Sequence, residues 1–247
     1  MRKFGLIGFP LGHSFSVPFF KLKFEKEKIR DISYLAYPIP SLELFPNLIE
    51  SNPELIGLNV TIPYKEKIIP FLDSVDPEAK KIGAVNTILL KNNQKLGFNT
   101  DIIGFKNSLI PLLDHKMING ALVLGTGGAS NAVGYVLNEM KIPFLVASRK
   151  ETGHRQKTIL YSQVDKNIIK SNLLIINCTP LGMYPNIDQF PEIPYEHLNS
   201  NHILYDLVYN PEETQFLNKG KLVGATLKNG LEMLYLQAEA SWKIWNQ

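Results

Sequence analysis

The residues best able to do chemistry stand where an apolar stretch ends. Residues 55–60 read as a buried strand, Pro63 ends it, and Lys65 follows two residues later. Because a proline fixes the turn, the chain can hold this lysine over a cleft, where partial burial lowers the pKa of its ammonium group. The pattern therefore predicts that Lys65 carries a proton. The alternative interpretation is a surface helix that begins at Lys65 and keeps the ammonium group in water.

Small polar residues cluster at the ends of other expected strands. The clusters are Gly12-His13-Ser14-Phe15-Ser16, Gly83-Ala84-Val85-Asn86-Thr87 and Gly97-Phe98-Asn99-Thr100-Asp101. Together with residues 59–65, and in this order and spacing, they resemble the shikimate dehydrogenase family. The second half adds 125–129, 177–183, 205–211 and 229–233, which read Gly-Thr-Gly-Gly-Ala, Asn-Cys-Thr-Pro-Leu-Gly-Met, Tyr-Asp-Leu-Val-Tyr-Asn-Pro and Asn-Gly-Leu-Glu-Met. The resemblance covers nearly the whole chain.

This resemblance implies an enzyme that reversibly reduces 3-dehydroshikimate to shikimate with NADPH, a step of aromatic amino-acid and chorismate biosynthesis. Lys65 and Asp101 match the catalytic pair of the family. Hydride transfer to a carbonyl carbon needs a proton donor at the oxygen, and a cationic lysine favours the charge that develops there. The aspartate would orient the lysine and tune its pKa. Which of the two delivers the proton stays open, because attraction and desolvation shift the pKa in opposite directions.

The resemblance also assigns the substrate contacts. It implies that the substrate carboxylate binds Ser14 and Ser16, with Thr61 and Tyr209 nearby, and that the ring hydroxyls bind Asn59, Asn86, Asp101 and Gln237. Spacing alone leaves open whether Gln237 faces such a ligand or the wet side of its helix. Val17 stands where the family has a proline, which predicts a shift of the helix start by one residue and makes Ser16 less secure than Ser14.

A glycine-rich turn predicts the cofactor site. The strand 121–124 leads into Gly125, Thr126, Gly127, Gly128 and Ala129, and a helix is expected over 130–140. Strand, Gly-rich turn and helix form the first unit of a dinucleotide-binding sheet, in which glycines let the backbone approach the pyrophosphate at the helix N-terminus. The alternative is a turn that serves packing alone.

The end of the strand 144–148 predicts which dinucleotide binds. Ser148 and Arg149 stand where NAD enzymes place an acidic residue, and a hydroxyl with a cation suits the 2′-phosphate of NADP(H). The alternative is that Arg149 is a solvated loop residue. The resemblance further implies that Thr179, Leu207 and Gly230 lie at the cofactor, where Gly230 would let the backbone approach the nicotinamide.

Alternating strand and helix signals predict an α/β fold with two domains. A substrate domain is expected over 1–101, completed by a C-terminal helix within 229–247, and a Rossmann-like NADP-binding domain over 102–228. Strands are expected at 4–8, 34–37, 55–60, 85–90 and 95–98, with helices at 17–28 and 42–50 and a hairpin at 91–94.

Only residues 151–156 separate Arg149 and Lys150 from the next strand signal, which predicts that the usual crossover helix is missing or reduced to a turn. Adenine binding would then be looser.

Composition narrows the class of protein. The chain has 247 residues, of which 45% are hydrophobic and 20% charged, and a net charge of +3 without a basic block, which argues against nucleic-acid binding. The single cysteine excludes an internal disulfide and a Cys-based zinc site, and no metal is expected. No signal peptide or transmembrane stretch is evident, so we expect a cytoplasmic enzyme of small molecules, as a monomer or homodimer.

Two other functions compete with this interpretation. A quinate or quinate/shikimate dehydrogenase of the same superfamily would use NAD and carry an acidic residue near position 149, where this chain has arginine. A non-catalytic binding paralogue would be expected to lose Lys65 or Asp101, and both are retained.

Overall fold

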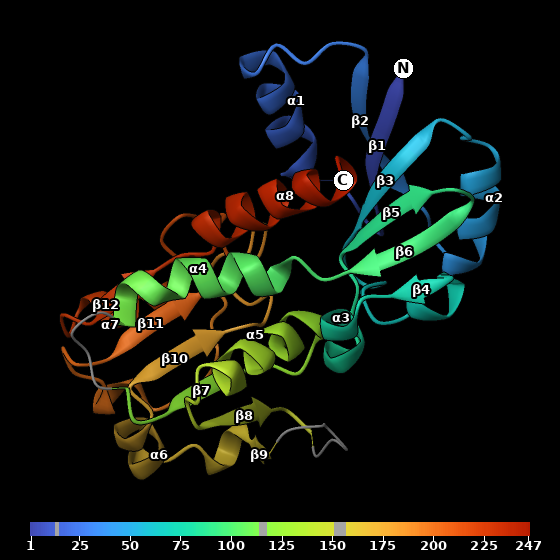
Figure 1. Cartoon of the computed structure of the whole chain (residues 1–247). Helices are drawn as coiled ribbons and strands as arrows, with labels where there is room; N and C mark the ends of the chain where they lie inside the picture. The colour runs from blue at the N-terminus through green and yellow to red at the C-terminus, as the bar shows by residue number, and fades with distance from the viewer. Residues whose placement is uncertain (13–14, 114–117, 151–156) are drawn as a thin grey trace. The chain divides into compact units, whose positions relative to one another are not determined.

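A computed structural model describes residues 1–12, 15–113, 118–150 and 157–247. The chain divides into two compact units, one made of 1–100 with 238–247 and the other of 101–237. Each unit contains a six-stranded sheet (Figure 1). The expected α/β fold is confirmed, with a mixed sheet in the first unit and a parallel one in the second.

The sheet of the first unit has the order β2-β1-β3-β5-β6-β4. Its strands are β1 (Arg2–Gly8), β2 (Ile32–Pro38), β3 (Leu55–Val60), β4 (Ser74–Val75), β5 (Thr87–Lys91) and β6 (Gln94–Phe98). β1 pairs in parallel with β2 and β3, whereas β5 is antiparallel to both β3 and β6. The hairpin is confirmed, and Asn92 and Asn93 turn it with positive φ angles of 52° and 58°.

The helices of the first unit differ from the expectation in three places. The helices are α1 (Ser16–Lys26), α2 (Phe45–Glu50) and α3 (Pro77–Ile82), with 3₁₀ turns at Leu42–Leu44 and Ile69–Phe71. The helical stretch expected over 42–50, with Ser41 as its cap, is confirmed but divides into a 3₁₀ turn and α2, because Pro46 has no N–H to continue the first turn. The surface helix from Lys65 is wrong, since that stretch forms turns. α3 was not predicted, although Asp76 caps it.

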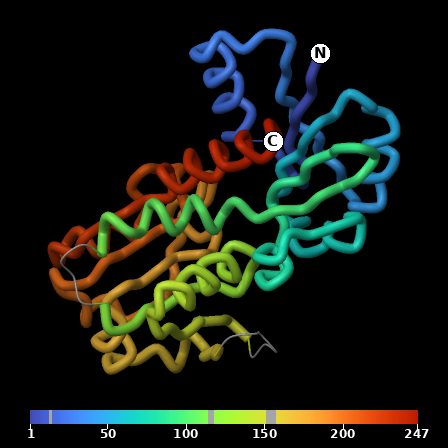
Figure 2. The backbone as a smooth tube through the Cα atoms, in the orientation of Figure 1, coloured from blue at the N-terminus to red at the C-terminus, as the bar shows by residue number. Residues whose placement is uncertain are grey.

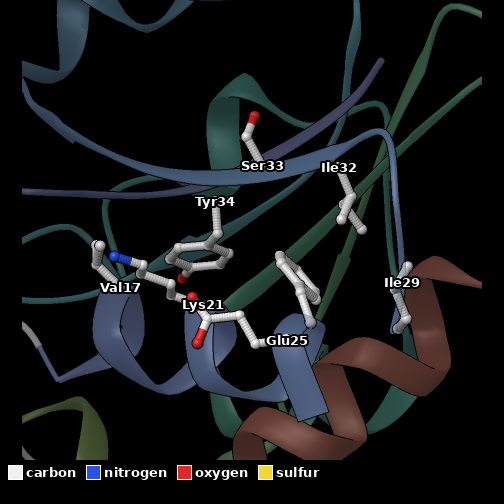
Figure 3. A pocket seen from close by; sticks show the side chains of 8 residues that line it. Val17, Lys21, Glu25, Ile29, Ile32, Ser33 and Tyr34 are labelled. Carbon is white, nitrogen blue, oxygen red and sulfur yellow. The ribbon is translucent and has the colours of Figure 1, made fainter. Parts of the chain in front are cut away.

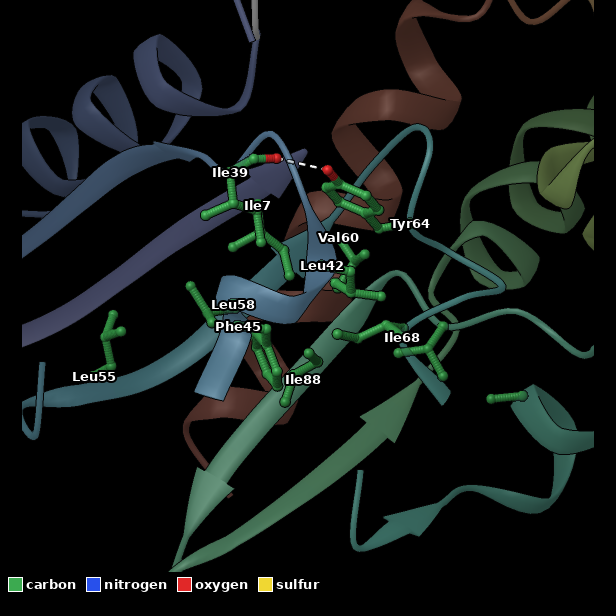
Figure 4. Close-up of a cluster of buried hydrophobic side chains, with 12 residues drawn as sticks. Ile7, Ile39, Leu42, Phe45, Leu55, Leu58, Val60, Tyr64, Ile68 and Ile88 are labelled. Atoms are coloured by element: carbon green, nitrogen blue, oxygen red, sulfur yellow. Dashed lines mark hydrogen bonds between the residues drawn. The ribbon is translucent and has the colours of Figure 1, made fainter. Parts of the chain in front are cut away.

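One core cluster of the first unit lies beside the segment that carries Lys65. Leu58, Val60 and Ile88 from the sheet pack with Phe45 of α2 in this cluster (Figure 4). Tyr64 is buried there, and its hydroxyl donates a 2.6 Å hydrogen bond to the carbonyl oxygen of Ile39. Burial of this ring and its satisfied hydroxyl fix the backbone one residue before the lysine.

The last helix, α8 (Leu231–Trp245), completes the first unit with its C-terminal half. The end of α8 lies beside the N-terminal strands (Figure 2), where Arg2 donates to the Asn246 side chain at 2.9 Å. Trp245 is 3% exposed, and its indole N–H donates to the Ile88 carbonyl oxygen at 2.9 Å. A Cβ at Gly57 would clash with the Trp245 ring, so only glycine lets the helix approach β3 this closely.

The second unit is a doubly wound parallel sheet of order β12-β11-β10-β7-β8-β9. Its strands are β7 (Ala121–Leu124), β8 (Phe144–Ser148), β9 (Thr158–Leu160), β10 (Leu174–Asn177), β11 (Ile203–Asp206) and β12 (Thr226–Lys228). Its helices are α4 (Asp101–Leu113), α5 (Gly128–Glu139), α6 (Lys166–Ser171) and α7 (Gln215–Lys221), with the first turns of α8. The central strands are fully buried and, except for Asn177 at the end of β10, apolar, as expected for a sheet covered on both faces.

The connection between β8 and β9 runs from 149 to 157. The missing crossover helix was predicted for 151–156, which lie outside the described residues. Among the described helices, none combines the length and apolar character that crossing a membrane requires.

Candidate active site

Backbone hydrogen bonds join the three polar segments of the first unit. The Val60 amide donates to the Asn86 carbonyl oxygen at 2.8 Å, and the Val85 amide donates to the Lys65 carbonyl oxygen at 2.7 Å. The Asn86 amide in turn donates to the Phe98 carbonyl oxygen at 3.0 Å. Segments that are far apart in the sequence therefore meet at the ends of β3, β5 and β6.

The side chain of Asn86 fixes the segment that leads into Asp101. Asn86 is 2% exposed, and its Oδ1 accepts from the Thr100 backbone amide at 2.7 Å. Its Nδ2 donates to the Thr100 hydroxyl at 3.0 Å. Asp101 follows directly, as the first residue of α4, and is 4% exposed. A buried carboxylate at a helix N-terminus is favoured by the helix dipole.

Ser16 and Asn59 are linked through Tyr34. The buried Tyr34 hydroxyl donates to Asn59 Oδ1 at 2.8 Å. Burial raises the pKa of this phenol well above its usual range, and a hydrogen bond with Ser16 opposes that shift. Ser16 is the first residue of α1 and is half-buried. Ser14 lies outside the described residues.

Thr61 and Lys65 lie on the turn that follows β3. The Thr61 amide donates to the Ile7 carbonyl oxygen at 2.9 Å, and its own carbonyl oxygen accepts from the Tyr64 amide at 2.9 Å. A Cβ at Gly8 would come within 2.5 Å of Thr61 Cγ2, so β1 packs directly against this threonine. Both Thr61 and Lys65 are half-buried. The turn is thus held rigidly while part of each side chain stays accessible.

The glycine-rich turn of the second unit fits a phosphate-bearing cofactor. Gly125 has a φ of +103°, which disfavours any other residue, and a Cβ there would meet Thr179 Cγ2 at 2.9 Å. Within the described part of the chain, no atom lies within 4 Å of a Cβ built at Gly127, and no side chain caps the N-terminus of α5. The first turn of α5 carries no acidic residue, and the fully buried Ser130 hydroxyl has no hydrogen-bond partner among the residues that the structure describes. A helix N-terminus without a side-chain cap, with a buried hydroxyl in its first turn, suits a phosphate group. Thr126, Gly128 and Ala129 complete the turn.

Two predicted cofactor residues end β8. Ser148 is 6% exposed, and its hydroxyl accepts from the Lys150 amide at 3.3 Å. Arg149 is exposed. A solvent-accessible guanidinium next to a fixed hydroxyl can bind a phosphate without first breaking a buried ion pair.

Sequence reasoning missed a buried carboxylate behind Thr179. The Thr179 amide and hydroxyl donate to Asn177 Oδ1 at 3.0 and 2.6 Å, and Asn177 Nδ2 donates to Asp206 Oδ1 at 2.9 Å. Asp206 also accepts from the Thr214 hydroxyl at 2.6 Å and the Val208 amide at 3.0 Å. Burial raises the pKa of Asp206 to about 6, against the effect of these donors. An aspartate that ends a strand in a parallel sheet was the available signal.

Close packing against the backbone requires a glycine at position 230. A Cβ there would clash with the Leu207 carbonyl oxygen, and the Gly230 amide donates to the Val208 carbonyl oxygen at 3.1 Å. The backbone that Gly230 approaches in this unit is therefore that of Leu207. Its assignment to the nicotinamide stays a prediction.

Asp101, Tyr209 and Gln237 are the predicted substrate residues of the second unit. Tyr209 and Gln237 are half-buried. Gln237 Nε2 donates to the Leu234 carbonyl oxygen at 3.1 Å, and a Cβ at Gly104 would come within 3.0 Å of the Gln237 Cβ. Gln237 thus packs against α4 and not on the solvent face of α8.

A separate cavity of about 360 Å³ lies between α1 and β2. Its lining includes Val17, Lys21, Glu25 and Tyr34, and Ser33 points to the other side of the strand from Tyr34 (Figure 3). The cavity contains none of the predicted site residues. Among the described residues, no group of three or more His, Cys, Asp or Glu side chains is placed to hold a metal ion.

Known proteins resemble the chain along its whole length. Residues 6–88 match the sequence profile described as "shikimate dehydrogenase substrate binding domain". A shikimate dehydrogenase (NADP(+)) of Methanococcus vannielii is 36% identical, over 98% of this chain and 90% of its own, and one of Clostridium beijerinckii is 39% identical, over 100% and 93%. The crystal structure of shikimate 5-dehydrogenase from Thermus thermophilus in complex with NADP(H) and shikimate matches with a TM-score of 0.86 and 31% identity, over 99% of this chain and 93% of that one. On this similarity, over the full length and in both units, the chain belongs to the shikimate dehydrogenase family.

Proposed function

We propose that this protein catalyses the reversible NADP-dependent reduction of 3-dehydroshikimate to shikimate. The observation that supports this proposal best is the joining of the segments 59–65, 84–87 and 98–100 by backbone hydrogen bonds within one unit. These segments carry an amine, amides and hydroxyls, which suit a substrate with a carboxylate, a carbonyl and several hydroxyl groups. Such a site discriminates strongly against analogues that lack a hydroxyl, because its buried polar atoms would be left unpaired.

Different residues of the chain have different roles in the proposed reaction. NADP(H), when bound, supplies hydride transfer. Lys65 places a positive charge at the substrate oxygen, where negative charge develops as the carbonyl is reduced, and Asp101 orients the amine. Ser14, Ser16, Thr61 and Tyr209 bind the carboxylate, whereas Asn86 and Gln237 hold ring hydroxyls.

The cofactor site belongs to the second unit in this proposal. The glycine turn and the first amides of α5 hold the pyrophosphate. Ser148 and Arg149 bind the 2′-phosphate, and Thr179, Leu207 and Gly230 line the nicotinamide half. The support for NADP over NAD is the cation at the end of β8, where no carboxylate stands.

The domain roles follow the two units. The first unit, with the end of α8, carries most of the residues assigned to the substrate, whereas Asp101, Tyr209, Gln237 and the NADP(H)-binding residues belong to the second. Cytoplasmic location and the choice between monomer and homodimer stay predictions, which fractionation of cells and analytical ultracentrifugation would test.

One assay separates the proposed function from its competitors. Purified protein is offered shikimate or quinate, each with NADP⁺ or NAD⁺, and cofactor reduction is followed by absorbance. We expect shikimate with NADP⁺ to give the highest kcat/KM. Preference for quinate with NAD⁺ would favour the quinate dehydrogenase, and binding of shikimate without turnover would favour a non-catalytic paralogue.

A further inference from the structure

A buried hydroxyl on the last helix connects polar residues of the first unit that come from three separate segments. Ser241 of α8 is fully buried. Its Oγ lies 2.9 Å from Asn59 Nδ2, 2.7 Å from the Thr87 hydroxyl and 3.1 Å from the Thr100 hydroxyl. These three partners stand 182, 154 and 141 positions earlier in the chain.

Backbone groups fix the orientation of both amides in this cluster. Asn86 Oδ1 faces the Thr100 backbone N–H, which can only donate, and Asn59 Nδ2 faces the Asn86 carbonyl oxygen at 3.2 Å, which can only accept. Exchanging the oxygen and nitrogen positions of either amide would therefore break its hydrogen bond to the backbone. The remaining protons must therefore be arranged around two fixed amides.

With the two amides fixed, the donor and the acceptor of each hydrogen bond in the cluster can be assigned. Asn59 donates to Ser241, Ser241 donates to Thr87, and Thr87 donates to Asn86 Oδ1 at 3.0 Å. In the other branch Asn86 Nδ2 donates to Thr100, which donates to Ser241. Each hydroxyl has one proton to give, and each gives it once. Ser241 is the junction of both branches.

The hydrogen bonds of Asn59 give this residue a different role from the one that the sequence suggests. Asn59 is 5% exposed, its two Nδ2 protons go to Ser241 and the Asn86 carbonyl oxygen, with Thr87 Oγ1 also within 3.2 Å of Nδ2, and its Oδ1 accepts from Tyr34. Both donors of this amide are used inside the protein. The Nδ2 group of Asn59 therefore acts within the protein, on the residues assigned to the ligand.

We propose that Ser241 and Asn59 are positioning residues for the substrate. Ser241 holds the hydroxyls of Thr87 and Thr100, these two hold the side chain of Asn86 in one orientation, and Thr100 leads directly into Asp101. This inference rests on the proposed function, because there Asn86 contacts the substrate and Asp101 orients the amine of Lys65. The C-terminal helix thereby sets the geometry of substrate-binding residues that stand far earlier in the chain.

The experiment removes one oxygen atom from the network. In Ser241→Ala, Asn59 and two threonines each lose a partner, so we expect the KM for shikimate to rise at least about fivefold, the factor that a net loss of ~1 kcal/mol gives. The KM for NADP⁺ should change less than about twofold, because the cofactor groups lie in the other unit. Thr87→Val, which keeps the shape and removes the hydroxyl, should act in the same direction. The KM increase in the double variant, expressed as a free energy, should be smaller than the sum for the two single variants, since both substitutions interrupt the same chain of hydrogen bonds.

A matched control separates positioning from stability. Ser108 of α4 is also fully buried, and its hydroxyl lies 2.6 Å from the Tyr205 hydroxyl in the second unit. Ser108→Ala should lower the melting temperature comparably while leaving the KM for shikimate unchanged. If Ser241→Ala does the same as this control, the network only supports the fold and the proposal is wrong. Should Ser241→Ala not fold, Thr87→Val gives the same comparison. An inactive wild-type protein would instead refute the proposed function, so the two failures are distinguishable.

Discussion

At the scale of single residues, Lys65 combines a fixed backbone with an accessible side chain. Its carbonyl oxygen accepts from the Val85 amide at 2.7 Å, and the preceding Tyr64 is anchored through its hydroxyl to the Ile39 carbonyl oxygen. The Lys65 side chain is half-buried. A general acid needs such placement, because proton transfer depends on hydrogen-bond distance before it depends on pKa.

We expect Lys65→Ala to lower kcat by roughly 10²-fold or more, the range of acid–base assistance, with the melting temperature little changed. Steady-state kinetics with shikimate and NADP⁺ measure the effect. Lys67→Ala, two positions further and exposed, is the control and should keep normal turnover. Near-normal kcat in the Lys65 variant would remove this lysine from the mechanism.

Arg149 tests cofactor choice at the same scale. Arg149→Ala should weaken NADPH binding by about 1 to 3 kcal/mol, the size of a lost charge-assisted hydrogen bond, and leave NADH binding nearly unchanged. Fluorescence titration with each cofactor measures both affinities. Lys166→Ala, another exposed cation of the second unit, should alter neither. Equal losses for NADPH and NADH would show that Arg149 does not bind the 2′-phosphate.

At the scale of elements, the carboxyl ends of β10 and β11 are tied together by Asp206. Its carboxylate holds Asn177 at the end of β10, and Asn177 holds Thr179 against Gly125. The same carboxylate bonds Val208 and Thr214, which fixes the segment that contains Leu207 and Tyr209. One buried acid thus supports several predicted ligand-binding residues in the second unit.

This buried acid makes stability depend on pH. Burial raises the pKa of Asp206 from 3.8 to about 6, so between these values the folded state binds a proton that the unfolded state has released. The contribution of Asp206 to stability is therefore greatest at low pH and is lost as pH rises to about 6. Relative to Asp206→Asn, the wild-type free energy of unfolding should fall by up to about 3 kcal/mol between pH ~4 and ~6.5 and then stay level. Urea titrations across this range measure it, and a pH-independent difference between the two proteins would contradict the assignment.

At the scale of the whole molecule, the first unit is built from two distant parts of the chain. Residues 238–247 join 1–100, so this unit is complete only after the second has been synthesised. The Trp245 ring lies 5.0 Å from Phe4 and 5.5 Å from Phe20, centroid to centroid, within an aromatic cluster around β1 and α1. The C-terminal helix thereby supplies part of the core and part of the polar network of this unit.

Removal of this ring should affect the first unit strongly. We expect Trp245→Ala to lower the free energy of unfolding by about 3 to 5 kcal/mol, from lost burial and a cavity in the core. Chemical denaturation measures the loss, with Lys243→Ala as an exposed control on the same helix. A loss below about 1 kcal/mol would mean that the end of α8 is not part of the cooperative unit.

Elements with a clear apolar pattern were predictable, whereas several short elements were not. The strands at 55–60, 121–124 and 144–148 have the expected bounds, and α8 lies within the expected range 229–247. No clear pattern predicted β4, α3, α6, α7 and β12, which have two to seven residues. Elements this short show too few periods for a hydrophobic pattern, and their caps, such as Asp76 and Asp165, were the remaining signals.

By itself, the sequence determined the family, the α/β class, the glycine turn and the cation at Arg149, because each depends on residues that are neighbours along the chain. Tertiary structure alone decided that Ser241 meets Asn59, that Gly230 packs on the Leu207 backbone, and that Asp206 lies behind Thr179. These contacts join residues far apart in sequence, and no local periodicity encodes them. A buried polar group takes whichever partner the completed packing offers, so its role is decided only when the chain has folded.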